Sequence, residues 1–383
     1  MFASKKLFLL FSSVRVLMAF LSTSWYVPDE TWQSVEISHG IVWPGKSFKT
    51  WEWQYGLRSY LHPLLFVPVF ELLKVLNLDS PFWVALCPRM LQGLLSSIAD
   101  VSSVVVFDRH FARRPSDTRW FIFVYATNWC LLYSGSRTLV NQLELVLTSF
   151  ALACYDANEG KRSCYIAIIA LSFVIRPTTA IFWLPLVLNH LYLIWKSGRN
   201  LIKEFILDLA PPAIATLAVC VALDSWFYGK LTFVPWNFLK FNLIMDVSSQ
   251  YGINSSHWYL SNALPTIFLG PLGLAPLLIG FVRSWRTSRE RRPPRIFLFA
   301  LIWSLLVYSS LSHKEHRFIL PFVPLCIAYI VYFVADFFSN RKNFRKLFVF
   351  ATLATHLPLT LYLSCIHQVR STKLNEYRVI TAI

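Results

Sequence analysis

Apolar runs long enough to cross a bilayer dominate this chain and leave little choice of fold. About 20 apolar residues are needed for a helix that spans the hydrocarbon core. The windows that approach this length fall near residues 5–25, 61–76, 82–107, 119–134, 139–156, 163–175, 179–195, 205–227, 262–282, 296–311, 318–338 and 346–366. The window 61–76 is short and holds Pro63 and Pro68, so it fits a re-entrant or interfacial piece. We therefore predict an all-α polytopic membrane protein, a bundle of roughly 11 transmembrane helices.

The composition agrees with this class and excludes soluble ones. Hydrophobic residues make up 56% of the 383 residues and charged residues 15%, and a soluble protein so apolar would aggregate. The seven cysteines lie within or at the ends of apolar runs, so no disulfide framework or metal site is implied. Lys5 and Lys6 precede an apolar run without a small-residue cleavage pattern, which favours an uncleaved signal anchor.

The distribution of basic residues predicts the orientation in the membrane. The net charge of +16 would suggest nucleic acid as a partner in a soluble protein, but 21 of the 36 basic residues fall in short loops on one side of the predicted bundle. By the positive-inside rule that side faces the cytosol, and no nucleic-acid partner is expected. The opposite side then carries the loops 26–60, 228–261 and 312–317 of a single membrane-embedded domain, residues 1–383. Asn254-Ser255-Ser256, a glycosylation sequon, lies on that side too.

Two polar clusters fall together on this non-cytosolic side. The first follows the first apolar run and contains Asp29 and Glu30 among tryptophans; the second is Ser312-His313-Lys314-Glu315-His316-Arg317. Ionisable groups beside membrane segments mark functional sites. The alternatives are a plain charged loop for the second cluster and an amphipathic interfacial helix for the first, with Glu30 paired to Lys46, Lys49 or Arg58.

The chemistry of the two clusters suits transfer from a lipid phosphate carrier. Asp29 or Glu30 is placed to act as the general base for an acceptor hydroxyl. His313, Lys314 and Arg317 offer cations for a phosphate, and Glu315 can orient one of them. No Gly-rich phosphate loop, HExxH or Ser/His/Asp pattern is present, so nucleotide-fuelled or zinc chemistry has no support and we predict no metal and no cofactor.

Several segments resemble the eukaryotic mannosyltransferases that use dolichol-phosphate-mannose. The likeness covers roughly residues 22 to 370. Within this family the sequence resembles the group that adds the third mannose of the glycosylphosphatidylinositol (GPI) anchor. The likeness rests on PDETWQSVEISH (28–39), TWEWQYGLRSY (50–60), PRMLQGLLSSIAD (88–100), YGKLTFVPWNFLKFN (228–242), YGINSSHWY (251–259) and LVYSSLSHKEHRFILPFVP (306–324). The resemblance implies a GT-C-type glycosyltransferase bundle in the endoplasmic reticulum membrane, with a lumenal active site, dolichol-phosphate-mannose as donor and a GPI-precursor glycolipid as acceptor.

The resemblance also implies roles for single residues. Asp29 matches the first-loop acid that is the expected base, with Glu30 beside it. The donor-phosphate side is formed by His313, Lys314, Glu315 and Arg317, and Trp258 and Tyr259 lie in a loop near the substrates. The chain departs from the pattern at His316, before the HWY of 257–259, and after His367, where relatives continue.

Three other functions remain open. The enzymes adding the fourth GPI mannose share the first loop but normally have Gln in place of Lys314, and the N-glycan mannosyltransferases have a different first loop. A transporter or flippase would also be polytopic, but it predicts charges near the midplane and repeated halves. Arg15 and Arg176 are the only basic residues well inside apolar runs, and no repeat is evident.

Overall fold

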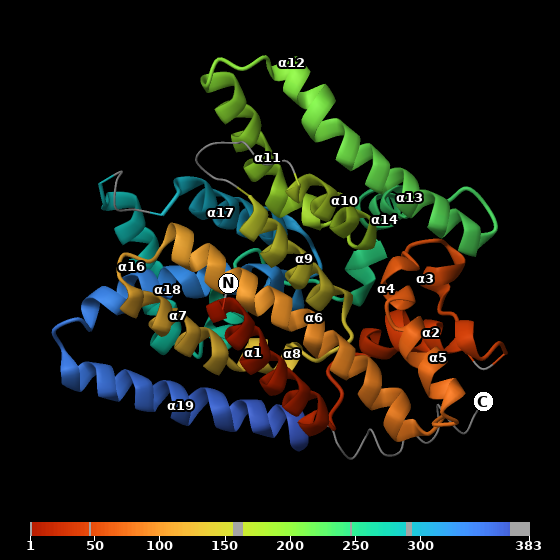
Figure 1. The fold of residues 1–383 in the computed structure, drawn as a ribbon, viewed down its shortest axis with the longest axis horizontal. Helices are drawn as coiled ribbons and strands as arrows, with labels where there is room; N and C mark the ends of the chain where they lie inside the picture. The colour runs from red at the N-terminus through yellow and green to blue at the C-terminus, as the bar shows by residue number, and fades with distance from the viewer. Residues whose placement is uncertain (1, 46, 156–163, 246, 289–292, 368–383) are drawn as a thin grey trace.

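Helices make up nearly all of the ordered structure of the chain. The structure is a computed structural model that describes residues 2–45, 47–155, 164–245, 247–288 and 293–367, and within these ranges it contains no β-strand. Figure 1 shows long helices stacked at various angles, with a cluster of short helices at one end of the bundle. The all-α prediction is confirmed.

The helices of the bundle largely follow the apolar runs of the sequence. They are α1 (Phe2–Leu21), α6 (Pro81–His110), α7 (Pro115–Thr127), α8 (Trp129–Ser134), α9 (Val140–Cys154), α10 (Tyr165–Ile175), α11 (Thr179–Lys196), α12 (Leu201–Glu204), α13 (Ala210–Tyr228), α16 (Pro271–Arg286), α17 (Arg295–Ser310), α18 (Val323–Phe337) and α19 (Lys342–Cys365).

Shorter elements connect these helices, and those between residues 31 and 75 cluster at one end of the molecule (Figure 1). They are η1 (Thr31–Val35), α2 (Glu36–Val42), α3 (Trp51–Gln54), α4 (Leu61–Leu64), α5 (Val67–Val75), α14 (Val234–Leu239), η3 (Lys240–Ile244), η4 (Val247–Tyr251), η5 (Tyr259–Ala263), α15 (Leu264–Ile267) and η7 (His316–Phe322), with η2 (Phe205–Leu209) joining α12 to α13.

Four helical stretches in the described ranges are long and apolar enough to cross a membrane by themselves. A fifth is a pair, Tyr259–Ile267 and Pro271–Arg286, bent by 113° at its break. The candidate window 61–76 instead divides into α4 and α5, and the nine residues of α5 span roughly 14 Å, too little for a bilayer. The prediction of roughly 11 crossings stays a prediction.

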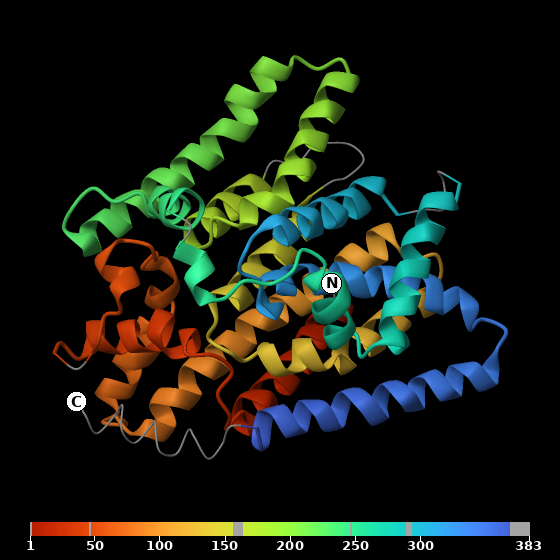
Figure 2. The ribbon, with the colours of Figure 1, turned by 180° about the vertical axis from the view of Figure 1, so that it is seen from behind.

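The spanning stretches differ in how deeply they lie in the bundle. In Pro81–His110 and His316–Phe337, 61% and 89% of the most apolar window is buried, whereas in Leu201–Tyr228 only 11% is. Figures 1 and 2 agree that α13 projects from the bundle and that α19 runs along its opposite edge. Outer helices with apolar exposed faces are expected where lipid is the solvent.

Buried ion pairs account for the two arginines inside apolar runs. Arg15 on α1 donates to both carboxylate oxygens of Asp100 on α6, at 2.9 and 2.7 Å, and Tyr125 donates to the same carboxylate at 2.9 Å. Arg176, just after α10, pairs with Glu144 of α9 at 3.0 Å. Because each arginine is paired with a carboxylate on a neighbouring helix, each ion pair fixes one helix against another.

Candidate functional site

The two polar clusters of the sequence meet in the structure. Nη1 of Arg317, at the start of η7, lies 2.6 Å from Oδ2 of Asp29, two residues before η1. The Arg317 side chain is 11% exposed and that of Asp29 30%, so the ion pair is partly shielded while the carboxylate stays within reach of a substrate. The prediction that both loops share one site is therefore supported by a direct contact.

Glu315 holds the Arg317 guanidinium from its other edge. Nε and Nη2 of Arg317 donate to the two oxygens of Glu315 at 2.7 and 2.8 Å, a bidentate pair that fixes the plane of the guanidinium. His313 lies 3.0 Å from Oε1 of the same carboxylate and 3.2 Å from the carbonyl oxygen of Gly252. Burial alone would raise the pKa of Glu315, but hydrogen bonds and charge from Arg317 and His313 hold it below its ordinary value.

Glu30 is turned away from Asp29 and is buried. Its two oxygens lie 3.1 Å from Nε of Arg89 and 3.2 Å from Nη1 of Arg137, which is itself fully buried. The loop partners proposed for it do not make this contact: Arg58 binds Glu52 and Lys49 binds Tyr60, while Lys46 lies outside the described residues. With both oxygens engaged, Glu30 ties the start of the first loop to the bundle.

Lys314 points into the protein instead of toward Asp29. The residue is 4% exposed, and its ammonium donates to the carbonyl oxygens of Leu311 and Asn254. Asn254 returns two bonds, from its backbone to Ser312 and from its side chain to the carbonyl oxygen of Lys314 at 3.1 Å. These contacts join the loop around 254 to the 312–317 segment, so in this structure Lys314 holds loops together.

Trp258 and Tyr259 flank the same segment from η5. Tyr259 is fully buried and its hydroxyl is 3.5 Å from the carbonyl oxygen of Glu315. The Trp258 ring lies 4.8 Å from that of His316, whose Nε2 is 2.9 Å from Oδ1 of Asn262. Trp258 and Tyr259 thus shape the back of the site, and His316, the departure from the family pattern, fits between Trp258 and Asn262.

Sequence reasoning considered Arg58 only as an ion-pair partner of Glu30, although it lies close to the charged groups of the site. Its Nη2 is 2.6 Å from Oε1 of Glu52, and it interacts electrostatically with both Asp29 and Arg317. Burial alone would lower the pKa of Arg58, but Glu52 and Asp29 raise it, so the guanidinium stays charged. The segment TWEWQYGLRSY carried this residue in the resemblance, which was the available signal.

Comparison with known proteins places the chain in a family. A model of the Alg9-like mannosyltransferase family matches residues 6–383. The chain belongs to this family. One similar relative is GPI alpha-1,2-mannosyltransferase 3 of Xenopus laevis, which is 36% identical over 346 residues. The aligned part covers 90% of the chain and 62% of the relative. The Homo sapiens protein of the same name is 35% identical over 93% of the chain and 61% of its own length.

An insect relative shows a similar identity and coverage. GPI mannosyltransferase 3 of Drosophila melanogaster is 34% identical over 94% of the chain and 62% of the relative. The Alg9-like chain thus spans a little over three fifths of the length of these curated relatives.

A solved structure shows the same fold. ArnT from Cupriavidus metallidurans, in its complex with undecaprenyl phosphate, superposes with a TM-score of 0.59 at 17% identity, covering 98% of the Alg9-like chain and 73% of ArnT. The apo form of ArnT gives a TM-score of 0.56. The predicted GT-C architecture is confirmed, since ArnT is a GT-C glycosyltransferase.

Proposed function

We propose that the chain is an α-1,2-mannosyltransferase that moves mannose from dolichol-phosphate-mannose to the second mannose of a GPI precursor. The observation that carries this proposal is the contact between Asp29 and Arg317, which brings the carboxylate proposed as the base next to the cation proposed to bind the donor phosphate. The names of its relatives, GPI alpha-1,2-mannosyltransferase 3 among them, supply the acceptor and linkage. The distribution of basic loops and the family resemblance support a site that faces the lumen of the endoplasmic reticulum.

Asp29 is the proposed general base. It accepts the proton from the 2-hydroxyl of the acceptor mannose, whose oxygen attacks the anomeric carbon of the donor sugar. The bond from that carbon to the phosphate oxygen then breaks, and dolichyl phosphate leaves. Arg317 is the proposed partner of the leaving phosphate. Glu315 holds its guanidinium through Nε and Nη2, and Asp29 contacts Nη1, so the phosphate would bind the second N–H groups of Nη1 and Nη2 that these carboxylates leave unused.

The remaining predicted residues take supporting roles. Glu30 is committed to Arg89 and Arg137, which favours Asp29 over Glu30 as the base. His313 orients Glu315, and Trp258 and Tyr259 support the segment from behind. A donor-phosphate contact by Lys314 stays a prediction that requires its ammonium to leave the carbonyl oxygens it now binds.

Two alternatives are weaker on this structure. A transporter or flippase predicts charged residues near the midplane and repeated halves. The two arginines inside apolar runs, Arg15 and Arg176, instead form ion pairs with Asp100 and Glu144. Addition of the fourth GPI mannose, or of mannose to an N-glycan precursor, fits the same site chemistry. The relatives named GPI alpha-1,2-mannosyltransferase 3 and GPI mannosyltransferase 3 favour the first proposal.

Transfer of labelled mannose in microsomes tests the proposal. With labelled dolichol-phosphate-mannose and a dimannosyl GPI acceptor, the wild-type chain should yield trimannosyl product. Asp29→Asn should slow transfer about 10²–10⁴-fold while the protein stays folded. Glu30→Gln should instead lower protein stability, because it leaves Arg89 and Arg137 with a weakened partner. Normal transfer by Asp29→Asn would exclude it as the base, and absence of product with the wild type would overturn the assigned reaction.

A further inference from the structure

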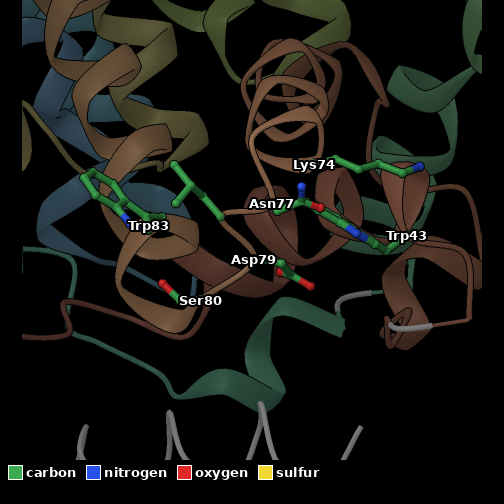
Figure 3. Close-up of a pocket in the computed structure, with 7 residues that line it drawn as sticks. Trp43, Lys74, Asn77, Asp79, Ser80 and Trp83 are labelled. Carbon is green, nitrogen blue, oxygen red and sulfur yellow. The ribbon is translucent and has the colours of Figure 1, made fainter.

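A polar cavity lies at the far end of the first-loop helix, away from Asp29. It has a volume of about 330 Å³ and is lined by Trp43, Lys74, Asn77, Leu78, Asp79, Ser80 and Trp83. Figure 3 shows the two indoles at opposite sides of the turn between α5 and α6, with Asn77, Asp79 and Ser80 between them. The volume is at the lower end of those found for small-ligand sites.

The aromatic walls of this cavity are held rigidly. The Trp43 ring stacks on His39, with centroids 4.5 Å apart, and meets Phe70 edge-on. His39 in turn lies 3.2 Å from Asp79, and Lys74 donates to the carbonyl oxygen of Val42 at 2.9 Å. These contacts fix the end of α2 against the turn after α5, so the cavity is part of the fold.

Two polar side chains at the cavity remain available to a ligand. Asn77 adopts a left-handed backbone conformation, with φ of 54°, and in the described part of the chain its side chain has no hydrogen-bond partner. Ser80 precedes α6, yet its hydroxyl makes no capping bond to that helix. An amide and a hydroxyl set between two indole rings match the needs of a sugar, which presents hydroxyls at its edge and C–H groups on its faces.

The position of the cavity relates it to the acceptor. Arg89 of α6 donates to the carbonyl oxygen of Ser22 just after α1, so the start of α6 lies on the same side of the bundle as Asp29. Helical residues run without a break from Asp29 to Val42, a length of roughly 20 Å. Next to the cavity, Leu72, Val75 and Phe82 expose more than half of their surface, as expected where helices meet lipid. The cavity thus lies near the membrane surface, several sugar rings away from Asp29.

From this arrangement we propose that the cavity binds the membrane-proximal sugars of the glycolipid acceptor while its terminal mannose lies at Asp29. The inference rests on the proposed function and extends it to acceptor selection. Trp43 and Trp83 pack on the sugar faces, and Asn77 and Ser80 bond their hydroxyls. The cavity therefore favours acceptors whose glycan has the right length between the lipid and the reacting mannose.

Acceptor kinetics in matched variants test this assignment. Asn77→Gly keeps the left-handed backbone and removes only the amide. Asn77→Gly and Trp83→Ala should each raise the KM for the dimannosyl GPI acceptor by about 3- to 10-fold, with the KM for dolichol-phosphate-mannose unchanged. Trp83→Phe should recover part of the loss. Val75→Ala, which removes exposed apolar atoms of α5 without touching a lining side chain, is the control for membrane contact and should leave the acceptor KM unaltered.

A truncated acceptor separates failure of this proposal from failure of the proposed function. A mannobioside without the remaining glycan should react equally poorly with wild type and both variants, because it cannot reach the cavity. Wild-type activity with an unchanged acceptor KM in both variants would overturn the proposal. So would a rise in acceptor KM for Val75→Ala equal to that for Trp83→Ala. If the wild type transfers no mannose, calorimetry with the deacylated acceptor head group decides: binding by wild type and loss in Asn77→Gly supports the site, and no binding overturns it.

Discussion

At the scale of single residues, one guanidinium connects the parts of the candidate site. Arg317 contacts Asp29 with one nitrogen and Glu315 with two others, so its position depends on both loops. This explains why the chain needs arginine here: an ammonium is a point charge and cannot reach three oxygens in one plane.

Arg317→Lys tests that requirement. The substitution keeps the charge but removes the bidentate bond to Glu315, and bonds to charged groups contribute about 1.5–3 kcal/mol each. We expect mannose transfer to fall roughly 10- to 100-fold with the bundle still folded. The measurement is single-turnover transfer in microsomes, with protein amount and monodispersity as controls. Full activity of Arg317→Lys would mean that charge alone suffices at this position.

The environment of His62 indicates that the stability of the folded protein depends on pH. The residue is buried in α4, both ring nitrogens lack a hydrogen-bond partner in the described structure, and burial together with the charge of Arg58 lowers its pKa to about 3. Between pH 6.5 and 3 the unfolded chain binds a proton at His62 and the folded chain does not, so acid favours unfolding. The limit for one such group is about 1.4 kcal/mol per pH unit.

His62→Phe should remove this contribution. We expect the thermal midpoint of the wild type in detergent to fall more steeply between pH 6.5 and 5 than that of the variant, since phenylalanine takes up no proton. Both profiles share every other titrating group, so their difference isolates position 62. Parallel profiles would show that His62 is protonated in the folded protein or is solvated.

At the scale of helices, close packing of α1 depends on small residues opposite Arg15. A Cβ on Gly135 would lie 2.1 Å from Nη1 of Arg15 and 2.9 Å from the carbonyl oxygen of Leu131, which that guanidinium binds. A Cβ on Gly93 would lie 3.2 Å from Arg15. Hence α1, α6 and the end of α8 can meet around the buried ion pair only because these positions lack side chains.

Gly135→Ala should therefore destabilise the protein. Forcing the guanidinium aside costs about 1–3 kcal/mol by overpacking alone, and weakening the pair with Asp100 adds to it. Gly93→Ala, which requires a smaller shift, should lose less. Denaturation in detergent, followed by near-ultraviolet circular dichroism, compares the two. Equal and negligible losses would contradict the tight packing seen around Arg15.

At the scale of the whole molecule, the side of the membrane on which the site lies decides which substrates reach it. The basic loops predict that the segment before Cys164 is cytosolic and that loop 26–60 is lumenal. Two exposed positions provide probes: Cys164 is an exposed native thiol, and Tyr55 is 57% exposed.

Labelling of sealed microsomes tests this orientation. An impermeant maleimide should modify Cys164 without detergent. Tyr55→Cys in a Cys164→Ser background should react only after the membrane is opened. The opposite pattern would place Asp29 and Arg317 on the cytosolic side and would exclude a lumenal active site.

Much of this architecture was predictable, but the pairing of side chains was not. Apolar length located the helices, and loop charge brought residues 26–60 and 312–317 to one side, where Asp29 meets Arg317. The sequence could not separate Asp29 from Glu30, because the partners of Glu30 lie 59 and 107 residues away on other elements. Nor could it show that Lys314 points inward, since composition gives a charged cluster without the direction of each side chain.

The exposed apolar surface next to the cavity of Trp43 and Trp83 has a consequence for how substrates arrive. Leu72, Val75 and Phe82 border this cavity. Loop 26–60, which carries Asp29, is predicted to lie on the same side of the membrane. Lipid-borne substrates therefore search a plane instead of a volume, and long-range attraction through water contributes little to encounter. Because Arg317 is already neutralised by two carboxylates, the site projects a weak field. Turnover should accordingly change little with ionic strength but should depend on the surface density of donor in the bilayer.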